Sequence, residues 1–185
     1  TAIYIYNSSS NTLTNITVSS SYYNGLSLSY SNSNTLTNIT LNSNSQGLYL
    51  YSSSSNTLTN IIADFNSLGL YIHSSNSNIL TNILIANSNN WGLFLAGSGF
   101  NTIKDSKFQD NTNCGIYIYT SFDNLIYNNI FNNTNNFCFD GPIYANYWNT
   151  TKQPGTNIWN ESLGFIGGNL WTNPNGTGYS DTCND

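Results

Sequence analysis

Short stretches in which apolar residues alternate with polar or aromatic ones recur along most of the chain. They read AIYIY from Ala2, GLSLS from Gly25, GLYLY from Gly47, GLYIH from Gly69, GLFLA from Gly92 and GIYIY from Gly115. Alternation with a period of two is typical of a β-strand with one buried face. A second marker, NTLTN or a variant of it, follows in the same phase from Asn11, Asn34, Asn56, Asn78, Asn101 and Asn124. Both markers advance in steps of 22 or 23 residues, which establishes an internal repeat.

Each repeat holds three short strand-like stretches separated by polar corners, and this predicts one coil of a parallel β-helix. The expected fold is all-β: a single-stranded right-handed parallel β-helix of about 6–7 coils with 22–23-residue repeats. Residues 1–149 are expected to form the β-helix, and residues 150–185, rich in glycine and aromatic residues, a C-terminal cap or tail. Leucine-rich repeats have a similar period but require an L-x-x-L-x-L frame, which is absent here.

Stacked coils should place equivalent residues of successive repeats in columns. Three inward columns are expected: Ile3, Leu26, Leu48, Leu70, Leu93 and Ile116; Ile5, Leu28, Leu50, Ile72, Leu95 and Ile118; and Leu13, Leu36, Leu58, Leu80, Ile103 and Ile126. Two corner columns consist of asparagine: Asn11, Asn34, Asn56, Asn78, Asn101 and Asn124; and Asn15, Asn38, Asn60, Asn82 and Asn128, with Asp105 in the fifth place. Asparagine tolerates the left-handed backbone of a corner, and stacked amides bond to their neighbours, so these columns predict a structural asparagine ladder.

The amino-acid composition excludes some classes of function. Charged residues are 6% of the chain and the net charge is −5, which excludes a nucleic-acid partner. The hydrophobic share of 38% is enough for a core, so the asparagine, serine and threonine content does not indicate disorder. No stretch is long and apolar enough to span a membrane. The chain begins at Thr1 and contains no methionine, which indicates a processed protein or a piece of a longer one, and we expect an extracellular or cell-surface location.

The coils, of the form G-[IL]-Y-[IL]-Y…N-T-[LI]-T-N, resemble the right-handed β-helix repeats of NosD-like proteins and of many archaeal cell-surface proteins. The segments YWNTTK from Tyr147, GTNI from Gly155, GGNLW from Gly167 and NGTG from Asn175 resemble the closing segment of those archaeal proteins. In such relatives the pattern often continues into an Asp/Gly repeat of calcium-binding type with another cysteine, and this chain stops at Cys183-Asn-Asp185. The resemblance therefore implies the fold and a surface role, with neither that metal loop nor its cysteine carried over.

The residue types of this chain argue against a copper site and against a catalytic site. Copper sites draw on histidine, methionine and cysteine, and this chain has 1 His, no Met and 3 Cys. His73 falls in an outward column, so we expect no copper and no cofactor. Glycoside hydrolysis requires paired carboxylates, which should stack one repeat apart and do not. Lys104, Asp105 and Lys107 form the local charge cluster; a lyase-like site is one interpretation and a solvated corner with an ion pair is the favoured one. We therefore expect a protein that is not an enzyme.

An outward aromatic stripe follows one sheet, with members Tyr4, Tyr49, Tyr71, Phe94 and Tyr117. Such rings stack on sugar faces or contact another protein in some proteins; alternatively, aromatic residues favour strands and stabilise them by stacking on their neighbours. Both interpretations stay open at this stage, and the stabilising one is favoured.

Covalent features are also predicted. Strict alternation points Cys114 and Cys138 to different sides, so a bond between Cys138 and Cys183 is expected, unless Cys183 pairs with a cysteine further downstream. Sequons for N-glycosylation begin at Asn7, Asn15, Asn38, Asn132, Asn149, Asn160 and Asn175, which is no more than chance gives in this composition.

The favoured function is a non-enzymatic structural protein, a subunit of a surface filament, sheath or surface layer. The first coil lacks a cap over Ile3, Ile5 and Leu13, and we expect it to meet the C-terminal region of the next copy in a head-to-tail homopolymer. The alternative for that open coil is that Thr1 is a cut in a longer chain whose earlier coils covered it. The alternative function is a carbohydrate-binding or carbohydrate-processing β-helix protein at the cell surface, so glycans are the other expected partner.

Overall fold

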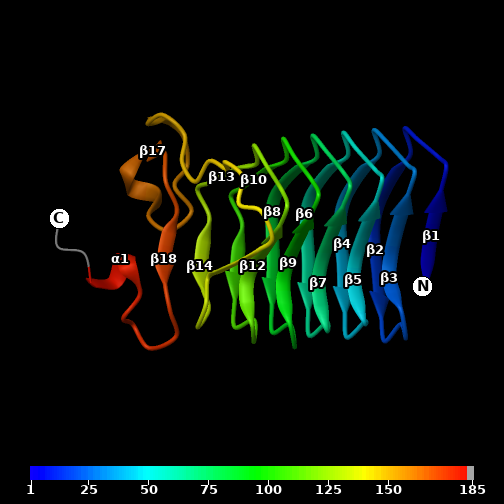
Figure 1. Ribbon diagram of the computed structural model, residues 1–185, viewed down its shortest axis with the longest axis horizontal. Coiled ribbons are helices and arrows are strands. Elements are labelled where there is room, and N and C mark those ends of the chain that lie inside the picture. Colours follow the sequence, from blue (N-terminus) through cyan, green and yellow to red (C-terminus); the bar gives the residue numbers. More distant parts are fainter. Residues whose placement is uncertain (183–185) are drawn as a thin grey trace.

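The computed structural model describes residues 1–182 and forms a parallel β-solenoid whose coils follow one another along a single axis (Figure 1). The strands that carry the alternating marker form one sheet of 7 strands. In spatial order these are β1 (Ile3–Tyr6), β3 (Asn24–Ser29), β5 (Gln46–Tyr51), β7 (Leu68–His73), β9 (Trp91–Ala96), β12 (Cys114–Tyr119) and β15 (Phe137–Asp140). All neighbours pair in parallel with matching register, as in Leu48 opposite Leu70, so the predicted all-β parallel fold is confirmed.

The asparagine-rich marker forms the second sheet. Its strands are β2 (Thr12–Ser19), β4 (Thr35–Asn42), β6 (Thr57–Asp64), β8 (Ile79–Ala86), β10 (Thr102–Lys104), β11 (Lys107–Gln109), β13 (Leu125–Tyr127), β14 (Ile130–Asn132) and β18 (Leu170–Thr172). The first four members join two of the expected short strands into one eight-residue strand with an asparagine at its middle. The backbone of that asparagine is in the left-handed region, with φ of 57° at Asn60, so the strand changes direction there.

The three predicted inward columns form the core. Apart from Ile3, Ile5 and Leu13, which are partly buried and pack against it, every member is at most 4% exposed. Phe108 and Phe131 extend this core into the later coils, where their rings stack 4.9 Å apart. A glycine is the second residue of β3, β5, β7, β9 and β12 because the backbones come close there: a Cβ on Gly47 would lie 2.5 Å from the carbonyl oxygen of Gly69.

The buried corner carries the first asparagine ladder. Asn34 donates to Asn56 and Asn56 donates to Asn78, each from Nδ2 to Oδ1 at 3.1 Å. The same Oδ1 atoms accept the backbone N–H of the residue one coil earlier, which satisfies a donor that the turn leaves unpaired. The sequence did not reveal two further ladders: a serine column (Ser31, Ser53, Ser75, Ser98 and Ser121) and an asparagine column that includes Asn44, Asn66, Asn111 and Asn133.

Residues after 149 cover the C-terminal end of the solenoid with short elements: β16 (Gln153–Pro154), the 3₁₀-helix η1 (Glu161–Leu163), β17 (Phe165–Ile166) and the helix α1 (Tyr179–Thr182) (Figure 1). β18 belongs to the same region, yet it pairs with β14 and so continues the second sheet. Trp171 on β18 stacks on Phe131 at 4.8 Å and thereby closes the core. The division at residue 149 stays a prediction from the sequence.

The expected disulfide is wrong. Cys138 bonds to Cys114, with their Cα atoms 6.1 Å apart, and the predicted partner Cys183 lies outside the described residues. Cys138 points outward as expected, because it stands opposite Tyr117 after a coil of 21 residues. The error lies at Cys114, where the alternation fails at the following Gly115. Cys114 stands opposite Trp91, whose ring stacks on the outward Tyr117 at 4.5 Å. Both cysteines therefore lie on the outer side of the first sheet.

Candidate functional site

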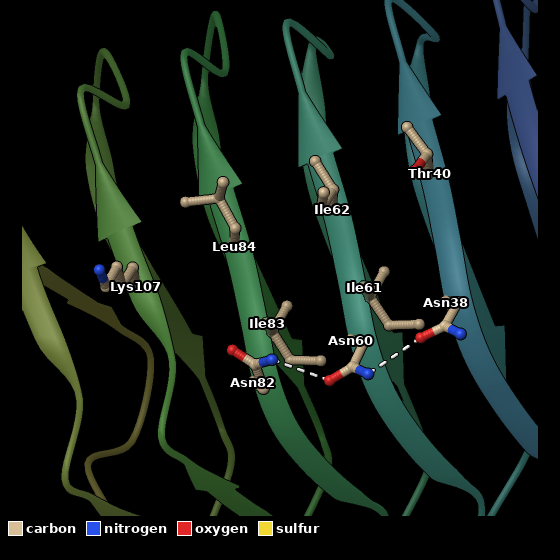
Figure 2. Close-up of a pocket in the computed structure, with 9 residues that line it drawn as sticks. All are labelled: Asn38, Thr40, Asn60, Ile61, Ile62, Asn82, Ile83, Leu84 and Lys107. Carbon is tan, nitrogen blue, oxygen red and sulfur yellow. Dashed lines mark hydrogen bonds between the residues drawn. The ribbon is translucent and has the colours of Figure 1, made fainter. Parts of the chain in front are cut away.

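The outer face of the second sheet carries a groove formed by two adjoining cavities, of about 420 and 500 Å³, which share Asn82 and Lys107. We call it the Asn82 groove. Its first part is lined by Asn38, Thr40, Asn60, Ile61, Ile62, Asn82, Ile83, Leu84 and Lys107 (Figure 2). Its second part adds Lys104, Asp105, Gly155, Thr156, Ile158, Glu161 and Ile166. The groove thus runs across β4, β6, β8 and β11 and ends against the C-terminal region.

The exposed asparagine column forms one edge of the groove. Asn82 donates from Nδ2 to Oδ1 of Asn60 at 2.8 Å, and Asn60 donates likewise to Asn38 at 2.9 Å (Figure 2). Each amide has two N–H donors and a carbonyl oxygen with two lone pairs, so the ladder uses about half of its capacity. Because these three side chains are exposed, the remaining donor and acceptor of each face solvent at the groove.

Apolar residues lie further along the same strands. Thr40 stands opposite Ile62, Ile62 opposite Leu84, and Leu84 opposite Lys107 in the register of successive coils. Ile62 is 40% exposed and so presents apolar surface to the groove. Figure 2 shows Thr40, Ile62 and Leu84 in a row that runs parallel to the asparagine ladder. The groove therefore offers amides on one side and an apolar strip on the other.

The charges of the groove gather at its C-terminal part. Lys104 Nζ lies 3.5 Å from Asp105 Oδ2, which confirms the ion pair expected at this corner. Asn128 Nδ2 donates to Asp105 Oδ1 at 2.6 Å and to the carbonyl oxygen of Thr156 at 2.9 Å. These contacts hold residues 155–166 beside β10 and build the far wall. The side chain of Lys107 is exposed and has neither an ion pair nor a hydrogen bond within residues 1–182.

The predicted aromatic stripe lies on the outer face of the first sheet. Tyr71 stacks on Tyr49 at 5.0 Å and on Phe94 at 4.6 Å, with an angle of only 2° between the Tyr71 and Phe94 planes. Tyr4, 58% exposed, is separated from these rings by Ser27. Because the rings face one another along the axis, their π-faces are already in contact, and this geometry favours the stabilising interpretation. A glycan or protein contact of the stripe stays a prediction.

The environment of the stripe alters the acidity of its phenols. Burial, followed by the neighbouring Tyr71, raises the pKa of Tyr49 to about 12. Burial also raises the pKa of Tyr71. The pKa of Tyr117 is raised by burial and then by its hydrogen bond to Asp140, in which the phenol O–H donates to Oδ2 at 2.9 Å. All three side chains are therefore neutral over the physiological pH range.

The remaining predicted site residues are spread over the surface. Five sequon asparagines are exposed (Asn7, Asn15, Asn38, Asn149 and Asn175), whereas Asn132 and Asn160 are half-buried. Asn38 donates from Nδ2 to Asn15 Oδ1, and a glycan there would replace the second hydrogen of the same nitrogen. Glycosylation and head-to-tail assembly through Ile3, Ile5 and Leu13 stay predictions.

Comparison with known protein families identifies the family of this chain. Residues 1–176 match the family described as "Periplasmic copper-binding protein (NosD)". The chain belongs to the NosD family. Membership confirms the expected resemblance, and the description gives the family a location outside the cytoplasm, in agreement with the disulfide. Within residues 1–182, none of the helices has the length and apolar character needed to cross a membrane.

The copper named in the family description does not fit the residues of this chain. His73 lies in the aromatic face, 5.5 Å from the Tyr71 ring and 5.2 Å from the Tyr51 ring. Both Cys114 and Cys138 are consumed by the disulfide, and the chain has no methionine. No group of three or more His, Cys, Asp or Glu side chains gathers within the described residues. A soft copper site therefore lacks its donors here.

Solved structures with a similar fold include epimerases of mannuronan and alginate and a domain of a bacteriophage tailspike protein. The A-module of mannuronan C-5 epimerase AlgE4 from Azotobacter vinelandii aligns with a TM-score of 0.66 and 16% identity over 68% of this chain and 36% of its own. A mutant of the periplasmic alginate epimerase AlgG aligns with a TM-score of 0.68 and 17% identity over 75% of this chain and 35% of its own. The enzymatically active domain of tailspike protein 2 of bacteriophage CBA120 aligns with a TM-score of 0.64 and 17% identity over 92% of this chain and 30% of its own. This chain thus spans about a third of each, and none of the curated protein sequences matches it.

These comparisons correct the expectation that the protein is not an enzyme. The similar structures are epimerases and an enzymatically active tailspike domain, so the exclusion of catalysis does not stand. At this identity the likeness shows the fold alone. The comparisons lend no support to a filament or sheath, and they agree better with the carbohydrate alternative.

Proposed function

We propose that this protein binds a carbohydrate polymer in the Asn82 groove, outside the cytoplasm and at the cell surface. The observation that carries the proposal is the exposed ladder of Asn38, Asn60 and Asn82 along the groove. Sugar hydroxyls both donate and accept hydrogen bonds, and each ladder amide has one donor and acceptor capacity left over. A repeating row of such amides suits a ligand that itself repeats.

The composition of the groove supports the same class of ligand. Carbohydrate sites combine polar groups that bond the hydroxyls with an apolar surface that covers the C–H groups of the ring. Ile62 and Leu84 supply such a surface directly beside the amides. The similar solved structures, named as mannuronan and alginate epimerases, are precedents for a solenoid that handles polysaccharides.

Affinity electrophoresis in native gels that contain polysaccharides tests the proposal, with isothermal titration calorimetry on the polymer that retards the protein most. Asn82→Gly removes one amide of the groove while glycine accepts the φ of 54° at this corner. The matched control is Asn15→Gly, because Asn15 belongs to the same ladder, has a φ of 57°, and lies outside the groove.

We expect Asn82→Gly to weaken binding about tenfold, as the loss of one or two hydrogen bonds implies, and Asn15→Gly to leave it unchanged. Thermal melting of both variants separates a change in the groove from a change in folding. Binding that persists unaltered in Asn82→Gly, or the absence of retardation by every polysaccharide tried, would contradict the proposal.

A further inference from the structure

The Asn82 groove repeats with the coil, and this constrains the length of the unit that it recognises. The ladder asparagines and the row of Thr40, Ile62 and Leu84 are two parallel columns with one member of each per coil. Neighbouring parallel strands lie about 4.8 Å apart, so each coil presents the same amide and the next apolar side chain at that interval. One pyranose unit in an extended chain is about as long as this interval. A linear glycan that lies along the solenoid axis would therefore meet one set of contacts per sugar.

The charges of the groove constrain the chemistry of that chain. The protein has 3 Lys+Arg in total, and two of them are engaged. Lys104 pairs with Asp105 at 3.5 Å, and Lys152 lies 4.7 Å from the centroid of the Phe165 ring. Lys107 is thus the single Lys or Arg side chain left for a ligand among residues 1–182, and the coils before it carry threonine, isoleucine and leucine in its column.

A polyuronate would need more than this groove supplies. With one sugar per coil it would place one carboxylate on each coil, and only the coil of Lys107 has a cation in that column. Glu161 at the far wall and a net charge of −5 repel such a polymer further. An uncharged chain meets no such obstacle, since amides, apolar side chains and the three donors of the Lys107 ammonium all suit hydroxyl-rich sugars.

We infer that the ligand of the Asn82 groove is a linear uncharged glycan lying along the solenoid axis, one sugar per coil, and that the groove rejects polyuronates. The inference rests on the proposed function, because it specifies the ligand of the same groove. It sets this chain apart from the similar structures named for mannuronan and alginate, whose sugars each carry a carboxylate.

Affinity electrophoresis and calorimetry with neutral oligosaccharides (cello-, manno- and galacto- series) and with sodium alginate test the inference, at low and at physiological ionic strength. We expect a neutral series to bind at least about tenfold more tightly than alginate at both ionic strengths. Thr40→Lys adds a second cation to the column of Lys107, and we expect it to create alginate binding that weakens as salt is added. Thr12→Lys is the matched control, because it changes the net charge equally on the same sheet outside the groove.

The outcomes separate the two claims. Wild-type binding of alginate as tight as that of any neutral series, and lost in Asn82→Gly, would overturn the inference and leave the proposed function standing. Equal gains of alginate binding in Thr40→Lys and Thr12→Lys would overturn it as well, since the effect would then come from net charge alone. Absence of binding to both the neutral series and alginate would overturn the proposed function and this inference together.

Discussion

Replacing Asn78 by alanine removes one rung of the buried asparagine ladder. Asn78 Oδ1 accepts two hydrogen bonds from Asn56, from the backbone N at 2.8 Å and from Nδ2 at 3.1 Å, and its own Nδ2 donates to Asn101 at 3.0 Å. All three residues are fully buried, so water does not replace the lost partner. Alanine therefore leaves two buried donors of Asn56 unsatisfied.

The expected cost follows from those two donors. Each unsatisfied buried donor costs about 1–3 kcal/mol, so Asn78→Ala should lower the free energy of unfolding by about 2–6 kcal/mol. Asn82→Gly is the comparison in the exposed ladder, where water replaces the lost bond and glycine accepts the positive φ, and it should cost about 1 kcal/mol or less. The two positions are four residues apart on the same coil, so the comparison sets a buried amide against an exposed one.

Urea unfolding followed by far-ultraviolet circular dichroism and by tryptophan fluorescence measures both variants. The two signals are needed because a solenoid can unfold in parts, and the tryptophans report mainly on the C-terminal coils. A destabilisation by Asn78→Ala that does not exceed that of Asn82→Gly would contradict this prediction, since it would show that the buried amides contribute no more than exposed ones.

Three further predictions follow from the structure. Peptide mapping without reduction should recover Cys114 linked to Cys138, and a peptide joining Cys138 to Cys183 would contradict the structure. Cys138→Ala should lower the free energy of unfolding by about 3 kcal/mol, because the bond closes a loop of roughly 25 residues. Because the pKa of Tyr49 is raised in the folded state, the folded protein holds the phenol proton at a pH where the unfolded chain has lost it. Stability should therefore be full below pH 10 and fall as the pH rises toward 12. Melting curves of Tyr49→Phe should show a smaller decrease of stability at alkaline pH. Tyr71→Ala should lower stability by about 1–3 kcal/mol through loss of its ring contacts with Tyr49, His73 and Phe94, and it should leave glycan affinity in the Asn82 groove unchanged. A loss of affinity without a loss of stability would instead favour a glycan contact on the stripe.

The sequence predicted several residues of the candidate site, but it did not predict that they lie together in one groove. The column of Asn38, Asn60 and Asn82 was predicted as a structural ladder, and Lys104 with Asp105 as an ion pair, and both are present. What the pattern did not reveal is that these features line one groove with Ile62 and Lys107. The far wall comes from residues 155–166, which the hydrogen bonds of Asn128 hold beside β10, and no repeat relates that segment to the coils.

The internal repeat is sufficient to predict the architecture. A period of 22 or 23 residues stacks like residues on like, so the inward columns and the asparagine ladders of Asn56 and Asn60 could be predicted from the repeat alone. The folded chain was needed to show where the period shortens and where the alternation fails. The coil after Ile116 is 21 residues long, which places Cys138 opposite Tyr117, and the alternation fails at Gly115, so that Cys114 lies on the outer side with Trp91. Glycine has no side chain to mark a face, and the lengths of irregular corners are set by their contacts, so neither feature is encoded in the alternation of the strands.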